Sequence, residues 1–255
     1  MADLRPPMPD MAALFRLDGK TAVITGGGSG IGRGAAHALS QAGADIILLD
    51  IDEDLVAQTA DEVGGTGLAI DVTDEDAVVD VFAGIHRCDV LVTCAGRSLR
   101  APSLETSMAD LQAVIDLNMS ATFLCAREAA WHMTEAGGSI VALASIMGHV
   151  GGRVFPNPAY HASKGAVVNL VRALAVEWAP QDIRVNAIAP TFVETPFISR
   201  VFEEPEMVDA IVDNTPLGRL ATVTDVAAAM LYLASPASAM VTGTSLPVDG
   251  GWLAH

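Results

Sequence analysis

Short runs of apolar, often β-branched residues alternate along the chain with longer segments of helical periodicity. Apolar runs of this length between turn-forming residues are typical of buried strands, whereas apolar positions spaced by three and four residues indicate helices packed through one face. Seven runs fit the strand pattern: 20–25, 44–50, 67–70, 88–93, 139–145, 183–189 and 245–248. The segments with helical periodicity lie between them.

Nearly continuous apolar strands separated by helices indicate an α/β fold, with a doubly wound parallel sheet that has helices on both faces. The chain has 255 residues, of which 51% are hydrophobic, and this size suits one domain, expected over 18–255. Residues 1–17 are expected to form an N-terminal arm, and about 192–214 a substrate lid. Ligands of such sheets bind beyond the carboxyl ends of the strands.

The formal net charge of -17 argues against a nucleic-acid or anionic-membrane partner, because both attract basic residues. Cys88, Cys94 and Cys125 lack the paired spacing of a zinc site, so we expect buried thiols and no metal. The chain begins without the basic and apolar regions of a signal peptide, and no apolar run approaches a membrane span of roughly 18 residues. These features predict a cytoplasmic protein.

The first expected strand runs into the glycine-rich stretch TGGGSGIG, residues 25–32, which precedes a helical segment. Glycines allow a tight turn and close approach to a pyrophosphate, and the helix N-terminus offers free N–H groups. Alone, such a stretch is equally consistent with a structural turn, but its flanking strand and helix favour a dinucleotide. The candidate contacts are Gly26, Ser29, Gly30, Ile31 and Gly32.

Asp50 ends the second expected strand, 18 positions after the last glycine of this turn. A carboxylate there is suited to the ribose hydroxyls of NAD and repels the 2′-phosphate of NADP. Neither Ser29 nor Ile51 supplies a compensating cation, although Arg33 lies nearby in sequence. We therefore expect NAD, with NADP as the less favoured cofactor. The alternative for Asp50 is a cap on the helix that begins around Asp52.

Tyr160 and Lys164 are one helical turn apart in AYHASKGAVVNL, residues 159–170, so a helix places them on one face. A tyrosine titrates near pH 10, and a neighbouring ammonium is expected to lower the pKa of the phenol and make it usable in proton transfer. A bare Tyr-x-x-x-Lys pattern is also common on exposed helices. Ser145, which ends the strand just upstream, supports the catalytic interpretation.

The order of glycine turn, acid, Asn118, Ser145 and Tyr-x-x-x-Lys resembles the short-chain dehydrogenase/reductase family over residues 18–251. The resemblance implies a single-domain Rossmann fold with a seven-stranded sheet. It implies that Tyr160 is the catalytic acid/base and Lys164 its cationic partner, which also binds the nicotinamide ribose. By the same resemblance, Ser145 orients the substrate oxygen and Asn118 holds a water that links Lys164 to solvent.

Further cofactor contacts are implied where the chain matches the family after its strands. The chain departs from the family pattern at Thr93 and Cys94, in place of two asparagines, and at Thr191, in place of a glycine. Asp71 is equally consistent with a cap on the helix expected from Thr73. The implied contacts are Ile51, Asp71, Val72, Ala95, Gly96, Pro190, Phe192, Val193 and Thr195.

The segments 97–103, 146–158 and 192–214 are expected to form the pocket wall and lid. The candidate substrate contacts are Ile146, His149, Arg153, Asn157 and Phe197. His149 and Arg153 are equally consistent with a solvated loop. Four acids of the lid add negative charge near the pocket mouth and favour a neutral substrate: Glu194, Glu203, Glu204 and Glu206.

These features predict an NAD-dependent oxidoreductase that transfers a hydride between the nicotinamide and a small secondary alcohol, polyol or ketone. The alternatives are a 3-oxoacyl-type carbonyl reductase that uses NAD(P)H and a non-catalytic NAD-sensing protein. Apolar residues spread around most of the helix expected over 160–179, so one of its faces needs a further apolar partner. We expect a homotetramer, as the family resemblance implies, with full burial inside a monomer as the alternative.

Overall fold

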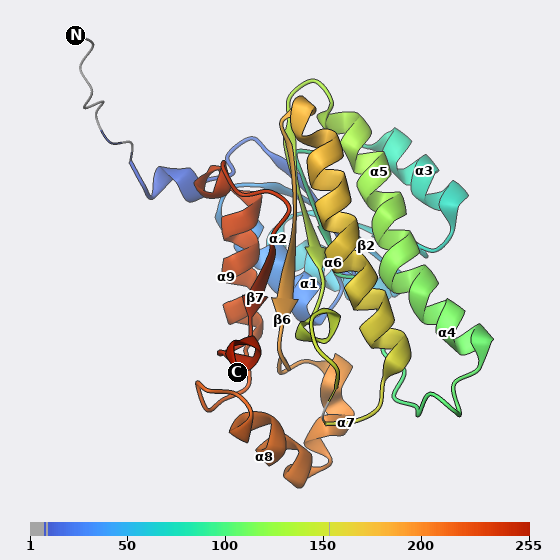
Figure 1. Ribbon diagram of the computed structural model, residues 1–255. Coiled ribbons are helices and arrows are strands. Elements are labelled where there is room, and N and C mark those ends of the chain that lie inside the picture. Colours follow the sequence, from blue (N-terminus) through green and yellow to red (C-terminus); the bar gives the residue numbers. More distant parts are fainter. Residues whose placement is uncertain (1–7, 9, 153) are drawn as a thin grey trace.

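The computed structural model describes residue 8, residues 10–152 and residues 154–255 (Figure 1). Its centre is one seven-stranded sheet in the order β3-β2-β1-β4-β5-β6-β7, in which every neighbouring pair is parallel. The strands are β1 (Thr21–Thr25), β2 (Asp45–Asp50), β3 (Thr66–Ala69), β4 (Val90–Thr93), β5 (Gly138–Leu143), β6 (Ile183–Pro190) and β7 (Ser245–Val248). The predicted doubly wound sheet is confirmed.

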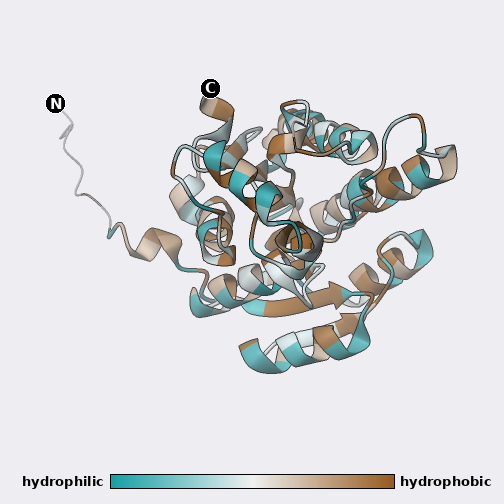
Figure 2. Ribbon diagram, turned by 90° about the horizontal axis from the view of Figure 1, so that it is seen from below, coloured by the Kyte–Doolittle hydropathy of each residue, from teal (hydrophilic) through white to brown (hydrophobic). Residues whose placement is uncertain are grey.

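Helices cover both faces of the sheet, and side chains of β1 alternate between the two cores. Val23 packs with α3 (Glu75–Gly84), α5 (Ala121–Met133) and α6 (Pro158–Trp178). Ala22 and Ile24 pack with α1 (Gly30–Gln41), α2 (Glu53–Val63) and α9 (Val223–Ala234) on the other face. Strands coloured hydrophobic lie between helices of mixed hydropathy in Figure 2. Burial on both faces explains the apolar strand runs.

Side-chain caps define where several helices begin. The carboxylate of Asp52 accepts a hydrogen bond from the Leu55 amide at the start of α2, and Asp74 does the same for α3. Ser107 caps α4 (Met108–Ile115), which continues through a π-helical turn (Asp116–Ser120) into α5. Asp50 and Asp71, for which a capping role was the alternative, are therefore not the caps of these helices.

The segment predicted as a lid lies beyond the carboxyl ends of the strands. It contains the short helices α7 (Ser199–Phe202) and α8 (Pro205–Asp213), at the bottom of Figure 1. Phe192, Ile198, Val201 and Ile211 pack there into a small separate core, against which Trp252 rests. This end of the sheet is thus partly covered by residues from the last quarter of the chain.

The described part of the N-terminal segment packs on the body of the protein. Leu17 is buried, and its amide donates a hydrogen bond of 2.8 Å to the carbonyl of Ala42. Phe15 contacts Tyr232 of α9, with ring centroids 6.5 Å apart. The rest of the expected arm, residues 1–7 and 9, lies outside the described residues. Within the described residues, none of the helices combines the length and apolar character needed to span a membrane.

Candidate active site

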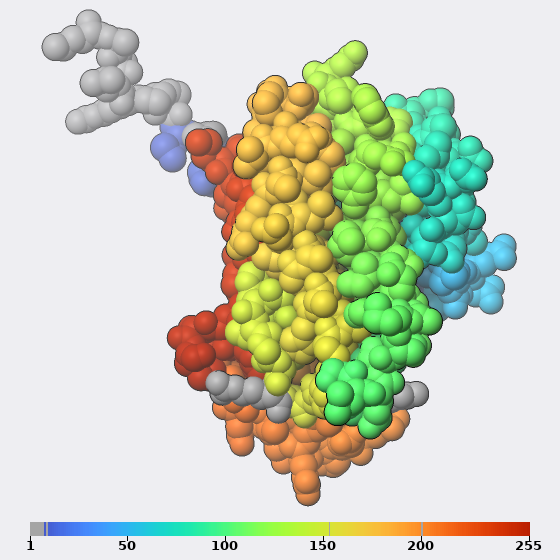
Figure 3. Space-filling model, turned by 45° about the vertical axis from the view of Figure 1, so that its right-hand side comes forward, coloured from blue at the N-terminus to red at the C-terminus, as the bar shows by residue number. Residues whose placement is uncertain are grey.

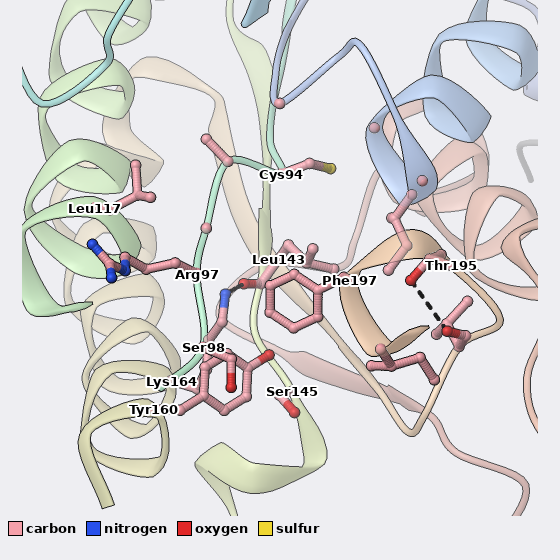
Figure 4. Close-up of a pocket in the computed structure, with 18 of the residues that line it drawn as sticks. Cys94, Arg97, Ser98, Leu117, Leu143, Ser145, Tyr160, Lys164, Thr195 and Phe197 are labelled. Atoms are coloured by element: carbon pink, nitrogen blue, oxygen red, sulfur yellow. Dashed lines mark hydrogen bonds between the residues drawn. The ribbon is translucent and has the colours of Figure 1, made fainter. Parts of the chain in front are cut away.

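A cavity of about 1050 Å³ opens at the carboxyl ends of the strands. It lies where the strand order reverses beside β1, which is the expected ligand position in such a sheet. All of the predicted cofactor contacts line it: Gly26, Ser29, Gly30, Ile31, Gly32, Asp50, Ile51, Asp71, Val72, Ala95, Gly96, Tyr160, Lys164, Pro190, Phe192, Val193 and Thr195. Figure 4 shows the part of this cavity around Tyr160.

The glycine turn after β1 has a shape that side chains would destroy. Gly26 has a φ of +65°, and a Cβ placed on it would lie 2.6 Å from the Ala95 amide nitrogen. A Cβ on Gly32 would collide with the carbonyl oxygen of Gly26. Ser29 precedes α1 without capping it, so the amide groups at the start of α1 are available to an anion. This cradle fits a pyrophosphate.

The carboxylate of Asp50 lies on the cavity wall and is fixed by two backbone amides. One oxygen accepts a hydrogen bond from Gly28 of the turn (2.9 Å) and the other from Asp52 (3.2 Å). Arg33, the cation closest to it in sequence, forms an ion pair with Glu62 (2.7 Å) and does not line the cavity. The site therefore presents a negative charge where a ribose is expected.

Asp71 lies on the same wall, after β3. One of its carboxylate oxygens accepts hydrogen bonds from the amide (2.9 Å) and the hydroxyl (2.7 Å) of Thr73. These contacts fix the turn before α3 and leave Asp71 and Val72 at the cavity surface.

Tyr160, Lys164 and Ser145 meet at one end of the cavity, as the sequence predicts (Figure 4). Tyr160 and Lys164 are in the first two turns of α6, and the Lys164 Nζ lies 5.7 Å from the centre of the Tyr160 ring. Ser145 follows β5, and its hydroxyl accepts a hydrogen bond from the Met147 amide (3.1 Å). The helix and the strand end thus bring two hydroxyl groups and an ammonium together.

The ionisation of this group differs from the sequence expectation. Burial raises the pKa of Tyr160 to about 12, although hydrogen bonding with Ser145 acts in the opposite direction. Burial also lowers the pKa of Lys164 to about 8. The Lys164 Nζ donates a hydrogen bond to the carbonyl of Leu143 (2.5 Å) and none to the phenol. The expected lowering of the Tyr160 pKa by Lys164 is therefore not found.

Asn118 lies behind the cavity wall in the π-helical turn and is fully buried. Its side-chain oxygen accepts a hydrogen bond from the Arg97 amide (2.8 Å), and its nitrogen donates to the Arg97 carbonyl (2.9 Å) and the Ser163 hydroxyl (2.9 Å). Both amide hydrogens are thus engaged. The side chain clamps the segment after β4 to α6, and the water expected between Asn118 and Lys164 stays a prediction.

The predicted substrate contacts are only partly brought together. Ile146, Asn157 and Phe197 line the cavity. His149 does not line it, and the prediction is wrong for this residue: its ring nitrogen Nε2 is 2.9 Å from the hydroxyl of Ser245 on β7. Arg153 lies outside the described residues.

The four lid acids that favoured a neutral substrate are absent from the described residues of the cavity wall: Glu194, Glu203, Glu204 and Glu206. These acids therefore give no reason to expect a neutral substrate.

Several residues of the cavity wall were not predicted individually from the sequence. Thr191 lines the cavity, and its buried hydroxyl has no hydrogen-bond partner among the described residues. Its departure from the family's glycine was the signal that could have identified it. His161 also lines the cavity, with Nδ1 2.6 Å from the Asn157 carbonyl. Cys94, Asp116 and Leu117 are further wall residues that were not predicted.

The comparisons with known proteins agree with this site. Residues 26–253 match a family model described as enoyl-(acyl carrier protein) reductase. Galactitol 2-dehydrogenase (L-tagatose-forming) of Cereibacter sphaeroides is 40% identical over 95% of this chain and 98% of its own length. D-threitol dehydrogenase of Mycolicibacterium smegmatis is 39% identical, over 93% of this chain and 94% of that protein.

A crystal structure of a putative NAD(P)-dependent gluconate 5-dehydrogenase from Beutenbergia cavernae, with bound NADP, superposes with a TM-score of 0.90. It is 40% identical and covers 95% of this chain and 100% of its own. Because the matches extend over nearly the whole chain and the relatives are dehydrogenases, this protein belongs to the short-chain dehydrogenase/reductase family and is a nicotinamide-dependent oxidoreductase.

Proposed function

We propose that the protein is an NAD-dependent dehydrogenase that oxidises a secondary alcohol of a small polyhydroxylated compound to a ketone. The observation that carries this proposal is the meeting of Tyr160, Ser145 and Lys164 on the wall of a cavity whose other end holds the glycine turn and Asp50. The relatives that act on galactitol and D-threitol support the substrate class.

Different residues of the cavity are expected to bind different parts of the cofactor. We expect the glycine turn and the start of α1 to hold the pyrophosphate and Asp50 to accept hydrogen bonds from the adenosine ribose. Thr191, whose hydroxyl lacks a partner, is suited to a hydrogen bond at the nicotinamide end. When bound, the oxidised nicotinamide accepts the hydride that leaves the carbinol carbon.

Tyr160 is the proposed base for the hydroxyl proton, and Ser145 the hydrogen-bond donor that stabilises the substrate oxygen. With a pKa of about 12, the buried phenol is almost fully protonated at neutral pH, so little phenolate is present to accept a proton. A positive charge nearby lowers the pKa of a phenol. We therefore expect Lys164 to leave the Leu143 carbonyl and turn toward the phenol and the ribose in the working complex. The role of Lys164 toward the phenol is then electrostatic.

Asn118 is proposed as a positioning residue. By fixing both backbone groups of Arg97, it sets the path of the chain that follows β4 along the cavity. Its bond to Ser163 ties the same segment to α6, one residue before Lys164.

Assembly as a homotetramer in the cytoplasm is also proposed. Figure 3 shows α4, α5 and α6 on one broad face of the molecule. Large apolar side chains are exposed on these helices, including Met108, Phe123, Trp131 and Val176. Such a surface suits a second subunit.

The function is tested by following NADH formation with galactitol, D-threitol, D-gluconate, a hydroxysteroid and a 3-hydroxyacyl thioester. We expect turnover with at least one polyhydroxylated compound, and faster turnover with NAD than with NADP. Preference for the thioester with NADP would favour the carbonyl-reductase alternative. NADH binding without turnover of any substrate would contradict the proposal.

Replacing Asp50 with alanine is expected to weaken NADH binding by about 10-fold or more, because hydrogen bonds to a charged group are lost. NADPH binding should change little or improve, because the carboxylate no longer repels the 2′-phosphate. Dissociation constants from cofactor fluorescence measure both effects. Arg33→Ala is the matched control, since Arg33 is paired with Glu62, and it should leave the ratio of the two constants unchanged. An equal loss for both cofactors in Asp50→Ala would contradict the assignment.

A further inference from the structure

The segment that follows β4 is fixed beside the proposed catalytic tyrosine. The Ser98 hydroxyl accepts a hydrogen bond of 2.7 Å from the side-chain amide of Asn157. The same Asn157 caps α6 by accepting a hydrogen bond from the Tyr160 amide (3.4 Å). Figure 4 accordingly shows Ser98 next to Tyr160. Asn118 also holds Arg97 of the same segment through two hydrogen bonds. Together these contacts fix the segment after β4 against the start of α6.

Arg100 lies two residues farther along this segment, within about 7 Å of Ser98 along the chain. Its guanidinium carbon is 4.2 Å from the centre of the Phe155 ring, and both residues line the cavity. Phe155 packs edge-on against Phe192 (6.1 Å), which contacts Trp252 (5.8 Å). The Phe155 ring thus contacts the guanidinium and is itself packed against Phe192.

An arginine held over an aromatic face is a common element of anion sites, because its planar guanidinium can bind a carboxylate in bidentate fashion. Lysine lacks this planar fork. The support of the aromatic rings also lowers the conformational entropy that Arg100 loses when it binds a ligand. The position of Arg100 over Phe155 on the cavity wall therefore suits an anion-binding group.

The charges of the cavity are unevenly distributed. Asp50 and Asp71 follow β2 and β3, at the adenosine end of the proposed cofactor site. Of the described wall residues outside that end, Asp116 is the acid, and its carboxylate accepts a hydrogen bond from Gln112 (2.7 Å). The segment after β4 contributes two arginines, Arg97 and Arg100. The substrate end therefore favours an anion over a neutral molecule.

We propose that Arg100 binds a carboxylate of the substrate, so that the substrate class is a polyhydroxylated carboxylic acid oxidised at a secondary hydroxyl some bonds away from the carboxylate. This inference rests on the proposed function and narrows its substrate class. The relatives do not decide the matter, because their names include both neutral polyols and gluconate. It replaces the expectation of a neutral alcohol.

The test compares matched substrate pairs that differ only in the terminal group: D-gluconate with D-glucitol, and D-galactonate with galactitol. Initial rates of NADH formation give kcat and KM for each. For the native protein we expect kcat/KM for the acid to exceed that for its alditol by about 10-fold or more in at least one pair, as a bidentate charged contact allows. An equal or greater kcat/KM for the alditols would overturn the inference and leave the proposed function intact.

Two variants identify Arg100 as the origin of the preference. Arg100→Met removes the charge and keeps much of the length of the side chain, and it should reduce kcat/KM for the acid by about 10- to 100-fold, mainly through KM. The alditol, which lacks the carboxylate, should lose much less kcat/KM than the acid, and circular dichroism shows whether the variant is folded. Arg100→Lys, which keeps the charge without the fork, should be intermediate. Equal losses for acid and alditol would overturn the inference, and no turnover of either series by the native protein would contradict the proposed function itself.

Discussion

Replacing Tyr160 with phenylalanine is expected to lower kcat for alcohol oxidation by about 100- to 10,000-fold, the range that a positioned acid or base contributes. The ring remains, so its contact with Phe197, at 6.2 Å between centroids, and the packing of α6 are kept. The hydroxyl proton then has no acceptor beside Ser145. Affinity for NADH, measured by fluorescence, should change by no more than a few-fold, which separates loss of chemistry from loss of the cofactor site.

The wild-type protein should also show a rate of alcohol oxidation that rises with pH, because the phenolate is the base and burial places the pKa of Tyr160 above neutrality. The remaining activity of Tyr160→Phe should lack this rise. Tyr232→Phe is a matched control, since Tyr232 is the other tyrosine of the chain and lies on α9 against Phe15. Comparable kcat values for the wild type and Tyr160→Phe would show that the proton takes another route.

Replacing Gly32 with alanine is expected to weaken NADH binding by at least about 100-fold. The new methyl group cannot fit, because it would collide with the carbonyl oxygen of Gly26 across the turn. Opening the turn moves the first amides of α1 out of the geometry that holds a pyrophosphate. Isothermal titration with NADH measures the loss, and circular dichroism shows whether the fold is retained.

Gly84→Ala is the control for this change. Gly84 is the last residue of α3, and a Cβ there would meet no atom within 4 Å. Its affinity for NADH should equal that of the wild type, and its stability should be the same or slightly greater, since alanine favours a helix more than glycine does. Unchanged NADH affinity in a folded Gly32→Ala protein would contradict the assignment of the turn.

The fold could be predicted because the strands are buried on both faces and therefore stand out as apolar runs. The strand boundaries were less predictable. The run 88–93 was expected to be one strand, but β4 begins at Val90. Asp89 precedes it, and its buried carboxylate binds the Thr21 amide and the side chains of Lys20 and Arg87. Such contacts depend on residues far away in the sequence.

The candidate site was likewise only partly predictable from the sequence. The glycine turn, Asp50 and the Tyr160–Lys164 pair follow from local spacing, and all of them line one cavity. The position of His149 depends on Ser245, which is 96 residues away. The bond from Lys164 to the Leu143 carbonyl and the stacking of Arg100 on Phe155 also join separate segments. Sequence spacing does not contain these pairings, so the details of the substrate end could not be predicted.

The most direct test of the account is isotope transfer. Galactitol, D-threitol and D-gluconate carrying deuterium at their secondary carbinol carbons are incubated with the protein and NAD, and the reduced cofactor is analysed by mass spectrometry and NMR. We expect deuterium at C4 of the nicotinamide from at least one of these compounds with the wild type, and almost none in the same time with Tyr160→Phe. Reduced cofactor without deuterium, or equal transfer by the two proteins, would contradict hydride transfer coupled to proton removal by Tyr160.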